Sequence, residues 1–377
     1  MTAATRKPRI ALVHDWLTGM RGGEKVLEAV CALFPDASLF TLVHVPGSVS
    51  PAIERLAPRA SVLSRLPGIA RSYRHLLPVF PAVIEQFDLD EYDLVISTSH
   101  CAAKSVVRPG RARHVCYCFT PMRYVWDQRH AYFGDDRFGP GSTRALRPIL
   151  AWLARWDAGT AHRVDRYLAD SQHVARRIQR YYNRQSGVIY PPVDTDFYRP
   201  DTTVPTATAL VVSALVPYKR IDVAIEACRQ TGVPLRVVGQ GSEEARLRAT
   251  AGPGVEFIGG SSDTEIRRFY REAGVVLLPG EEDFGIVPVE AQACGRPVVA
   301  LGRGGALETV VDGVTGVLVS SDLPEALAAG IRRALDGRFD PAAIRKHAEE
   351  FGPERFSAQF RAVIDQTLSA PAGEASW

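Results

Sequence analysis

The stretch VVLLPGEEDFGIVPVEA, residues 275–291, decides the fold of this chain. It begins with a continuous apolar run, 275–278, that predicts a buried strand. From Val287 to Cys294 the pattern predicts a helix, which Gly295-Arg296-Pro297 ends. The stretch is therefore a strand-to-helix turn, the unit from which parallel sheets covered by helices are built.

The turn carries groups that suit a phosphate and a sugar. Glu282 and Glu290 flank it, and Gly285 lets a ligand approach the backbone closely. The N–H groups of the first helical turn favour an anion. Together these groups suit a nucleoside diphosphate sugar, although a capped helix start with two solvated glutamates has the same pattern.

Similar strands alternate with segments of helical length along the whole chain. That alternation predicts an α/β protein of βαβ units, with helices on both faces of parallel sheets. The strand candidates are residues 9–13, 38–42, 93–97, 113–117, 166–169, 209–213, 234–238, 255–258, 275–278, 297–300 and 316–318.

The pattern restarts near residue 205, after a Pro-rich and Thr-rich stretch that suits a linker. We therefore expect an N-terminal domain over 1–195 and a second domain over 196–352. A terminal helix follows in 353–377, and residues 369–377 are expected to fray.

Composition and charge exclude several classes of protein. With 46% hydrophobic and 23% charged residues, the chain is typical of globular proteins. Its six cysteines show no zinc or redox spacing and are expected to be buried thiols in a reducing compartment. The apolar run 10–13 is too short for a signal peptide or a spanning helix, so a cytoplasmic protein is expected.

The charge is unevenly distributed. Residues 1–195 have a net charge of +9 and residues 196–377 a net charge of −6. A basic half attracts anionic surfaces. Membrane lipid and a pyrophosphate-bearing substrate are candidate partners, whereas no nucleic-acid motif is visible.

Several motifs together resemble family 4 of the retaining glycosyltransferases. Glu282 and Glu290 have the spacing of that family's E-x7-E signature. The other marks, in chain order, are His14-Asp15-Trp16 with Gly22-Gly23-Glu24-Lys25, then 97–100, 214–220 and 304–308. The segment 118–127 further resembles bacterial O-antigen and exopolysaccharide enzymes, many of them mannosyltransferases.

The resemblance implies the GT-B fold, in which two Rossmann-like, doubly wound domains face each other across a cleft. It also implies that the C-terminal helix crosses back to the first domain. The expected catalytic residues are His100, Lys219 and Glu282. The expected donor-binding residues are Gly22, Gly23, Arg220, Gly259, Asp283, Phe284, Gly285, Ile286, Val287 and Glu290. The expected acceptor-binding residues are His14, Trp16, Arg123, Tyr124, Trp126 and Asp127.

Individually these residues also have plain structural interpretations. His100 could cap a helix or lie in the core, the Gly22-Gly23 pair could be an ordinary turn, and Lys219 could be solvated. The chain also departs from the family, because many members have Gly-Arg where it has Ser213-Ala214. Arg220 or an N-terminal lysine would then replace the missing phosphate-binding arginine.

The expected function is retaining transfer of a hexose, with mannose favoured, from a nucleotide diphosphate sugar such as GDP-mannose. The acceptor would be a saccharide or a polyprenyl-pyrophosphate-linked glycan in cell-surface polysaccharide biosynthesis. No metal and no cofactor are expected. The alternatives are a sugar-nucleotide epimerase of related fold and a non-catalytic sugar-binding or scaffold protein.

A basic segment, residues 65–77, suggests where the protein works. It contains Arg65, Arg71, Arg74 and His75 among leucines and isoleucine. It is either an ordinary amphipathic surface helix or a basic face that rests weakly on an anionic membrane. The second interpretation predicts peripheral contact with the inner face of the cell membrane.

Overall fold

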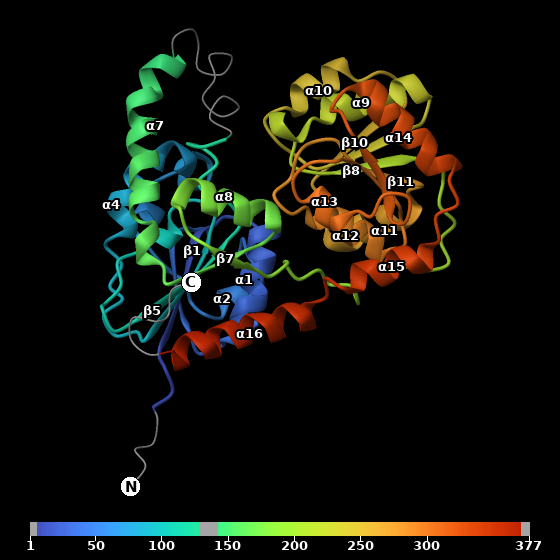
Figure 1. Ribbon diagram of the computed structural model, residues 1–377. Helices are drawn as coiled ribbons and strands as arrows, with labels where there is room; N and C mark the ends of the chain where they lie inside the picture. Colours follow the sequence, from blue (N-terminus) through green and yellow to red (C-terminus); the bar gives the residue numbers. More distant parts are fainter. Residues whose placement is uncertain (1–5, 128–141, 371–377) are drawn as a thin grey trace. The chain divides into compact units, whose positions relative to one another are not determined.

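The computed structural model describes residues 6–127 and 142–370, which form two compact units (Figure 1). Unit 1 contains the described residues up to Tyr190 and those from Phe356 on, and unit 2 runs from Pro191 to Arg355. The expected second domain, 196–352, falls inside unit 2. Of the tail expected to fray, residues 371–377 lie outside the described part.

Unit 1 is built on a seven-stranded sheet in the order β3-β2-β1-β4-β5-β6-β7. All neighbouring strands in it are parallel. The strands are β1 (Ile10–Leu17), β2 (Ser38–His44), β3 (Arg59–Ala60), β4 (Leu94–Ser99), β5 (Arg113–Cys118), β6 (Arg166–Ala169) and β7 (Ser186–Val188).

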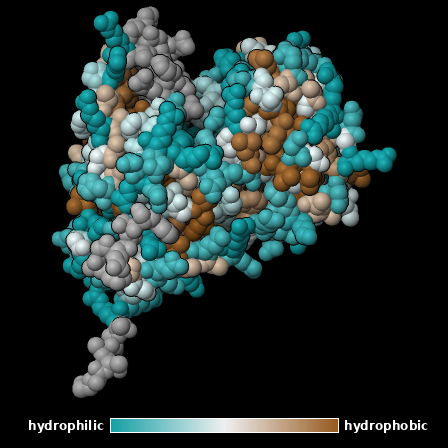
Figure 2. Space-filling model, in the orientation of Figure 1, coloured by the Kyte–Doolittle hydropathy of each residue, from teal (hydrophilic) through white to brown (hydrophobic). Residues whose placement is uncertain are grey.

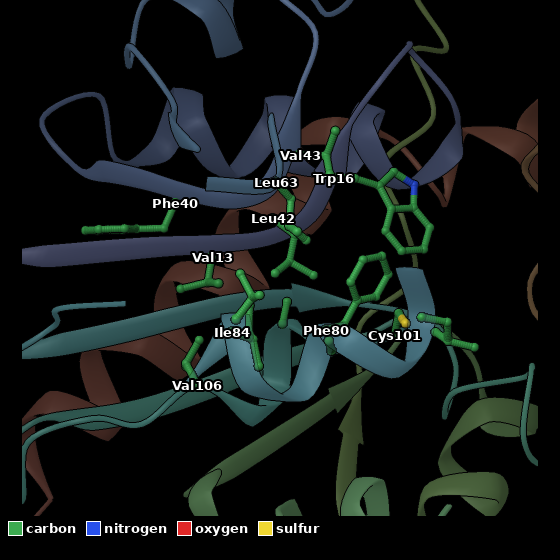
Figure 3. Close-up of a cluster of buried hydrophobic side chains, with 14 of the residues drawn as sticks. Val13, Trp16, Phe40, Leu42, Val43, Leu63, Phe80, Ile84, Cys101 and Val106 are labelled. Atoms are coloured by element: carbon green, nitrogen blue, oxygen red, sulfur yellow. The ribbon is translucent and has the colours of Figure 1, made fainter. Parts of the chain in front are cut away.

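Alternate residues of these strands enter different cores, as the two-residue period of a strand requires. In β1, Ala11 and Val13 pack with Phe40 and Phe80 in the cluster drawn in Figure 3. Leu12 instead joins the cluster on the opposite face. The sheet is therefore covered on both faces, as the sequence pattern predicts.

The helices of unit 1 cover these two faces. The longer ones are α1 (Gly22–Leu33), α7 (Ser142–Gly159), α8 (Gln172–Tyr182) and α16 (Pro353–Ser369). The short segments are α2 (Pro51–Glu54), η1 (Val62–Arg65), α3 (Ile69–Ser72), η2 (Tyr73–Val79), α4 (Phe80–Ile84), η3 (Ala103–Ser105) and η4 (Ala161–Arg163).

The last helix packs on the first unit. α16, red in Figure 1, places Phe356, Phe360 and Ile364 in the same core cluster as residues of β1 and α1. The ring of Phe356 lies 5.8 Å from that of Tyr117 in β5. The return of the C-terminal helix to the first domain, which the family resemblance implied, is confirmed.

Three local predictions for unit 1 were wrong or incomplete. β1 continues to Leu17, because it is paired with β2 as far as that residue. The short edge strands β3 and β7 were not expected. Residues 65–77 form no single helix: η1 ends at Arg65, Gly68 at φ +70° precedes α3, and α3 continues directly into η2.

Unit 2 contains a six-stranded parallel sheet in the order β10-β9-β8-β11-β12-β13. Its strands are β8 (Ala209–Val212), β9 (Leu235–Val238), β10 (Val255–Gly259), β11 (Val275–Leu278), β12 (Val298–Leu301) and β13 (Gly316–Val319). The helices are η5 (Pro217–Lys219), α9 (Ile221–Thr231), α10 (Glu244–Thr250), α11 (Asp263–Glu272), α12 (Ile286–Ala293), α13 (Ala306–Thr309), α14 (Pro324–Asp336) and α15 (Pro341–Glu349).

The core of unit 2 also follows the strand period. Val275 and Leu277 of β11 pack with α9 and α14 in one cluster. Both units are thus doubly wound, and the expected pair of Rossmann-like domains is confirmed.

The outer surface is mostly hydrophilic on the face drawn in Figure 2, with a larger group of hydrophobic residues over unit 2. All six cysteines are free and buried, as predicted. Across 6–127 and 142–370, no helix is both long and apolar enough to cross a membrane.

Candidate functional site

In unit 2, the loops that follow β8, β11 and β12 pack against one another at the carboxyl edge of the sheet. At Gly280 an added Cβ would lie 2.4 Å from the carbonyl oxygen of Tyr218, so only glycine allows this approach. At Gly304, with φ +61°, an added Cβ would lie 2.2 Å from the carbonyl oxygen of Glu282. The N–H of Gly305 also donates to that oxygen at 2.8 Å. These backbone contacts hold the three loops together independently of their side chains.

The loop packing brings two predicted catalytic side chains together. The ammonium of Lys219, at the end of η5, donates to Oε1 of Glu282 in a close ion pair. Their side chains are 16% and 14% exposed. The ammonium also lies 5.1 Å from the ring centre of Tyr218. A diphosphate reaching Lys219 would compete with this carboxylate.

Arg220, predicted to bind the donor, is the N-cap residue before α9 and has a left-handed backbone at φ +52°. Its guanidinium donates to Oδ2 of Asp322 at 2.6 Å, and its Nε lies 3.5 Å from Oδ1 of Asp222. Ala214, two residues after the end of β8, is exposed. In this structure both adjacent cations, Lys219 and Arg220, are therefore held by carboxylates.

The start of α12 offers backbone donors. Gly285 precedes the helix at φ +88° and, having no side chain, cannot itself cap the first turn. Ile286 and Val287 provide the first N–H groups, and the helix dipole favours an anion beside them. Phe284 is 3% exposed and packs on Phe351 at 5.7 Å, so its side chain supports the loop from inside. Asp283 is half-buried in the same loop.

Glu290, the second signature glutamate, lies in a buried tyrosine cluster. It is 5% exposed, and the hydroxyl of Tyr270 donates to its Oε2 at 2.8 Å. Burial raises the pKa of Tyr198, and the charge on Glu290 raises it further. The two tyrosines orient this carboxylate, and no sequence signal pointed to them. The ribose-binding role of Glu290 stays a prediction.

Gly259 lies at the end of β10 with φ +82°. Its carbonyl accepts from the N–H of Gly239 at 2.7 Å, and the register of the two strands shifts at this point. It lies beside the loop after β9 at the same edge of the sheet, and its contact with a donor stays a prediction.

In unit 1, the predicted residues gather where β1 and β4 end. Nδ1 of His14 lies 2.7 Å from Oγ1 of Thr98, and its Nε2 lies 3.8 Å from Oε1 of Glu24. The ring of Trp16 meets that of His100 edge-on at 4.4 Å. Trp16 is 3% exposed and also packs against Phe80 (Figure 3).

The Gly22-Gly23 pair forms the first turn of α1, beside this ring cluster. A Cβ added at Gly23 would lie 3.4 Å from the ring of Phe119. His14 is fully buried and Trp16 nearly so, so both rings pack inside the cluster. Their acceptor-binding roles stay predictions.

The charges in this cluster shift one another's pKa values. Burial raises the pKa of Glu24, but the imidazoles of His14 and His100 outweigh burial, so the pKa lies below its ordinary value. Burial lowers the pKa of His100, which Asp15 and Glu24 only partly offset. The side chain of His100 remains 25% exposed, so a neutral imidazole is presented at the surface of the cluster.

Asp15 is the residue that the sequence interpretation overlooked. Its side chain is fully buried and accepts hydrogen bonds from the backbone N–H groups of residues 100–103, at 2.6 to 3.0 Å. Its Oδ2 also lies 3.1 Å from Nδ1 of His100. Asp15 was quoted within a motif but received no role, because the sequence does not show which turn it would meet.

The expected acceptor residues 123–127 are tied to the framework of unit 1. The indole of Trp126 donates to Asp157 at 2.8 Å and stacks on Tyr181 at 4.6 Å. Asp127 accepts from Arg177 and from the hydroxyl of Tyr181. Tyr124 is 9% exposed in the core cluster, and Arg123 is half-buried. This arrangement orders the segment after β5, and its contact with an acceptor stays a prediction.

Comparison with known proteins identifies two matching family models. "Glycosyltransferase Family 4" matches residues 20–197, and "Glycosyl transferases group 1" matches residues 195–351. The D-inositol 3-phosphate glycosyltransferase of Mycobacterium marinum is 31% identical over 314 residues, which cover 71% of this chain and 67% of that protein. Its counterpart in Geodermatophilus obscurus is 32% identical over 226 residues, 51% of this chain and 50% of that protein. The chain thus spans about half the length of the first curated relatives it matches.

Solved structures share the fold at low sequence identity. The Anabaena protein HepE, in complex with UDP, has a TM-score of 0.71 at 19% identity, covering 95% of this chain and 100% of that one. Sucrose-phosphate synthase from Thermosynechococcus elongatus has a TM-score of 0.69 at 18% identity, covering 97% of this chain and 100% of that one. At these identities the likeness concerns the fold alone.

Proposed function

The chain belongs to the family 4 glycosyltransferases, and from this membership we propose that it transfers a hexosyl group from a nucleoside diphosphate sugar to a saccharide acceptor. Retention at the anomeric carbon and mannose as the transferred sugar are part of the proposal. The main structural support for this proposal is that adjoining loops of unit 2 contain Lys219, Glu282 and the start of α12.

The leaving group explains this arrangement. When the sugar–phosphate bond breaks, negative charge develops on the nucleoside diphosphate. Once the diphosphate is bound, Lys219 and the first N–H groups of α12 are donors that stabilise such charge. Removing one donor of this kind from an enzyme typically costs about 100-fold or more in turnover.

The ion pair of Lys219 with Glu282 suggests an exchange of partners. The diphosphate takes Lys219, and the released carboxylate of Glu282 accepts hydrogen bonds from sugar hydroxyls. Lys219 then contacts a phosphate both in the complex with the donor and while the sugar–phosphate bond breaks. Glu290, which accepts a hydrogen bond from Tyr270, is proposed to bind the ribose of the nucleotide.

The donor base has two candidates. Resemblance of residues 118–127 to mannosyltransferases favours GDP-mannose. The structural neighbour HepE has been solved with UDP and, in another structure, with UDP-glucose, so a UDP sugar is the second candidate donor. A thermal-shift panel of nucleotide sugars discriminates between them, because a ligand that binds only the folded state raises the melting temperature.

A turnover assay tests the reaction class. With the best-binding sugar nucleotide and a lipid-linked or free saccharide, transfer releases the nucleoside diphosphate only when the acceptor is present. Conversion of the donor without acceptor would instead indicate an epimerase. Full activity after Lys219→Ala would refute the proposed role of the lysine.

We further propose that the protein works in the cytoplasm, in weak contact with the inner face of the membrane. Arg65, Arg71 and Arg74 are all exposed, although on short helical turns rather than on one helix. From residue 55 to residue 84 the sequence contains no acidic residue. Such a basic surface suits an anionic bilayer and a polyprenyl-pyrophosphate-linked acceptor.

A further inference from the structure

A lysine and an aspartate form an ion pair in the interior of unit 1. The ammonium of Lys104 lies 3.1 Å from Oδ1 of Asp157, and the two side chains are 1% and 0% exposed. The same ammonium donates to the backbone carbonyl of Asp157 at 2.6 Å and to the hydroxyls of Ser105 and Thr160 at 3.2 Å. An apolar pair of similar size often stabilises a fold as well as a buried ion pair does, because removing two charges from water is costly. The groups that this pair holds therefore indicate its role.

The carboxylate of Asp157 is the acceptor for two aromatic side chains. Its Oδ2 accepts from the indole N–H of Trp126 at 2.8 Å and from the hydroxyl of Tyr182 at 2.9 Å. Burial raises the pKa of Tyr182, and the charge on Asp157 raises it further, so this hydroxyl keeps its proton and donates. The ammonium of Lys104 lies 4.5 Å from the centre of the Tyr182 ring. One carboxylate thus joins α7, α8 and the segment that follows β5.

The pair connects two loops at the carboxyl edge of the sheet. Lys104 lies in η3, which ends the turn after β4, and Trp126 lies in the segment 120–127 after β5. β4 and β5 are parallel neighbours, and ligands of open parallel sheets bind beyond the carboxyl ends of the strands. Burial is the main effect that lowers the pKa of His100, and the charge on Arg123 lowers it further. The histidine turn and the segment 120–127 are therefore within electrostatic reach of each other.

The segment 120–127 is held at other points as well. Arg177 of α8 donates to Oγ1 of Thr120 at 2.5 Å and also pairs with Asp127. The apolar side chains of the segment that lie in the core cluster are Met122, Tyr124 and Val125. The segment is therefore a fixed surface, and the indole of Trp126 is the point at which the buried pair holds it.

We propose that Asp157, balanced by Lys104, is a positioning residue that holds Trp126 and thereby fixes the segment 120–127 beside the turn after β4 for the saccharide acceptor. That the segment contacts the acceptor rests on the proposed function. An ionised carboxylate only accepts, so it suits the N–H of an indole, which only donates. Lys104 supplies the opposite charge and also satisfies a carbonyl near the end of α7, where carbonyls lack partners within the helix. A displacement of about 1 Å in such a site costs about 100-fold in rate, so a fixed segment matters for transfer.

Two double variants of the full chain separate the ion pair from its hold on Trp126. Lys104→Met with Asp157→Asn removes both charges and keeps an acceptor for the indole, whereas Lys104→Met with Asp157→Leu removes that acceptor too. Neither leaves a buried charge without its partner. The ¹H–¹⁵N signal of the Trp126 indole, assigned with Trp126→Phe, should exchange slowly with D₂O in the wild type and in the Asn variant. It should exchange about tenfold faster or more in the Leu variant, as expected when a hydrogen bond to a charged group is lost. Equal exchange in the two variants refutes the hold, and so does fast exchange in the wild type, which is decisive even if the Leu variant does not fold.

Transfer kinetics test the effect on the acceptor. The donor is GDP-mannose or UDP-glucose, and the acceptors are methyl α-mannoside and polyprenyl-pyrophosphate-linked N-acetylglucosamine. In the Leu variant and in Trp126→Phe, kcat/KM for the acceptor should fall by about 10- to 100-fold, and the Asn variant should restore most of it. The Kd of the nucleoside diphosphate, proposed to bind in unit 2, should stay at the wild-type value, a split that a general loss of stability does not produce. Wild-type kcat/KM in both Trp126→Phe and the Leu variant refutes the positioning role. If the wild type transfers to neither acceptor, the proposed function fails for them, and the indole exchange alone decides the hold of Asp157 on Trp126.

Discussion

Replacing Glu282 by glutamine should strengthen the binding of a nucleoside diphosphate while it weakens turnover. The carboxylate of Glu282, 14% exposed, is the counter-ion of Lys219, whose side chain is 16% exposed. Ion pairs at exposed positions contribute up to about 1 kcal/mol, and this mostly covered pair should reach at least that value. A diphosphate no longer has to break the pair in Glu282→Gln. Its Kd should therefore fall by about fivefold, which corresponds to about 1 kcal/mol.

Turnover should change in the opposite direction. Once the diphosphate has taken Lys219, the carboxylate is proposed to accept hydrogen bonds from the sugar. A hydrogen bond to a charged group contributes about 1.5 to 3 kcal/mol, and the amide keeps only part of that. The expected loss in kcat/KM for the donor is about 10- to 100-fold.

Titration calorimetry with GDP and UDP, together with initial rates of transfer, separates these effects. Glu281→Gln, on the exposed neighbouring residue, is the matched control for the loss of one negative charge. Lys219→Ala should weaken diphosphate binding and reduce turnover by about 100-fold or more. If Glu282→Gln weakens diphosphate binding as Lys219→Ala does, the two residues bind the phosphate together and the exchange of partners is wrong.

The other predictions test the ribose site, the membrane contact and a buried histidine. Glu290→Gln should weaken the binding of the free nucleoside diphosphate and of the intact donor alike, because the ribose is common to both; calorimetry that shows wild-type affinity for both would refute the role. The triple change Arg65→Glu, Arg71→Glu and Arg74→Glu should abolish salt-sensitive cosedimentation with anionic vesicles and leave activity on a soluble acceptor unchanged, and no cosedimentation of the wild type at low salt would contradict the proposal. Burial lowers the pKa of His114 from 6.5 to about 3, so its neutral form stabilises the fold above pH 6.5 and this contribution is lost as the pH falls toward 3. From pH 7.5 to pH 5 the loss should be about 2 kcal/mol. Urea unfolding followed by tryptophan fluorescence reports on unit 1, which contains all four described tryptophans, Trp16, Trp126, Trp152 and Trp156. His114→Gln should reduce the pH dependence, and an equal dependence in both proteins would rule out this histidine as its source.

The parallel sheets were predictable because buried strands and their turns have local signals. The apolar run 275–278 is β11, and the predicted strand 166–169 is β6. The end of β1 was not predictable, because His14-Asp15-Trp16 has the composition of a loop. Pairing with β2, which lies more than 20 residues away, keeps these residues in the sheet.

Several residues of the candidate site were predictable from the sequence, but the contacts between them were not. Motif spacing identified Lys219 and Glu282, but their ion pair joins residues 63 positions apart. Tyr270, which donates to Glu290, is likewise brought to this carboxylate by the packing of α11 against α12. Contacts of this kind depend on how helices pack on the sheet, and no local pattern in the sequence specifies that packing.

Asp15 and Glu282 each accept from a segment distant in the sequence, and their different burial separates their roles. Asp15 is 0% exposed and accepts four backbone N–H groups, so removing it would leave several buried donors without a partner. Each such donor costs about 1 to 3 kcal/mol, which makes Asp15 a permanent part of the fold. Glu282 is 14% exposed and pairs with a single flexible ammonium, an interaction of about 1 kcal/mol that a doubly charged phosphate group can replace. The first carboxylate therefore fixes the backbone turn after β4 in unit 1. The second neutralises Lys219 in unit 2, where the proposed diphosphate would compete with it.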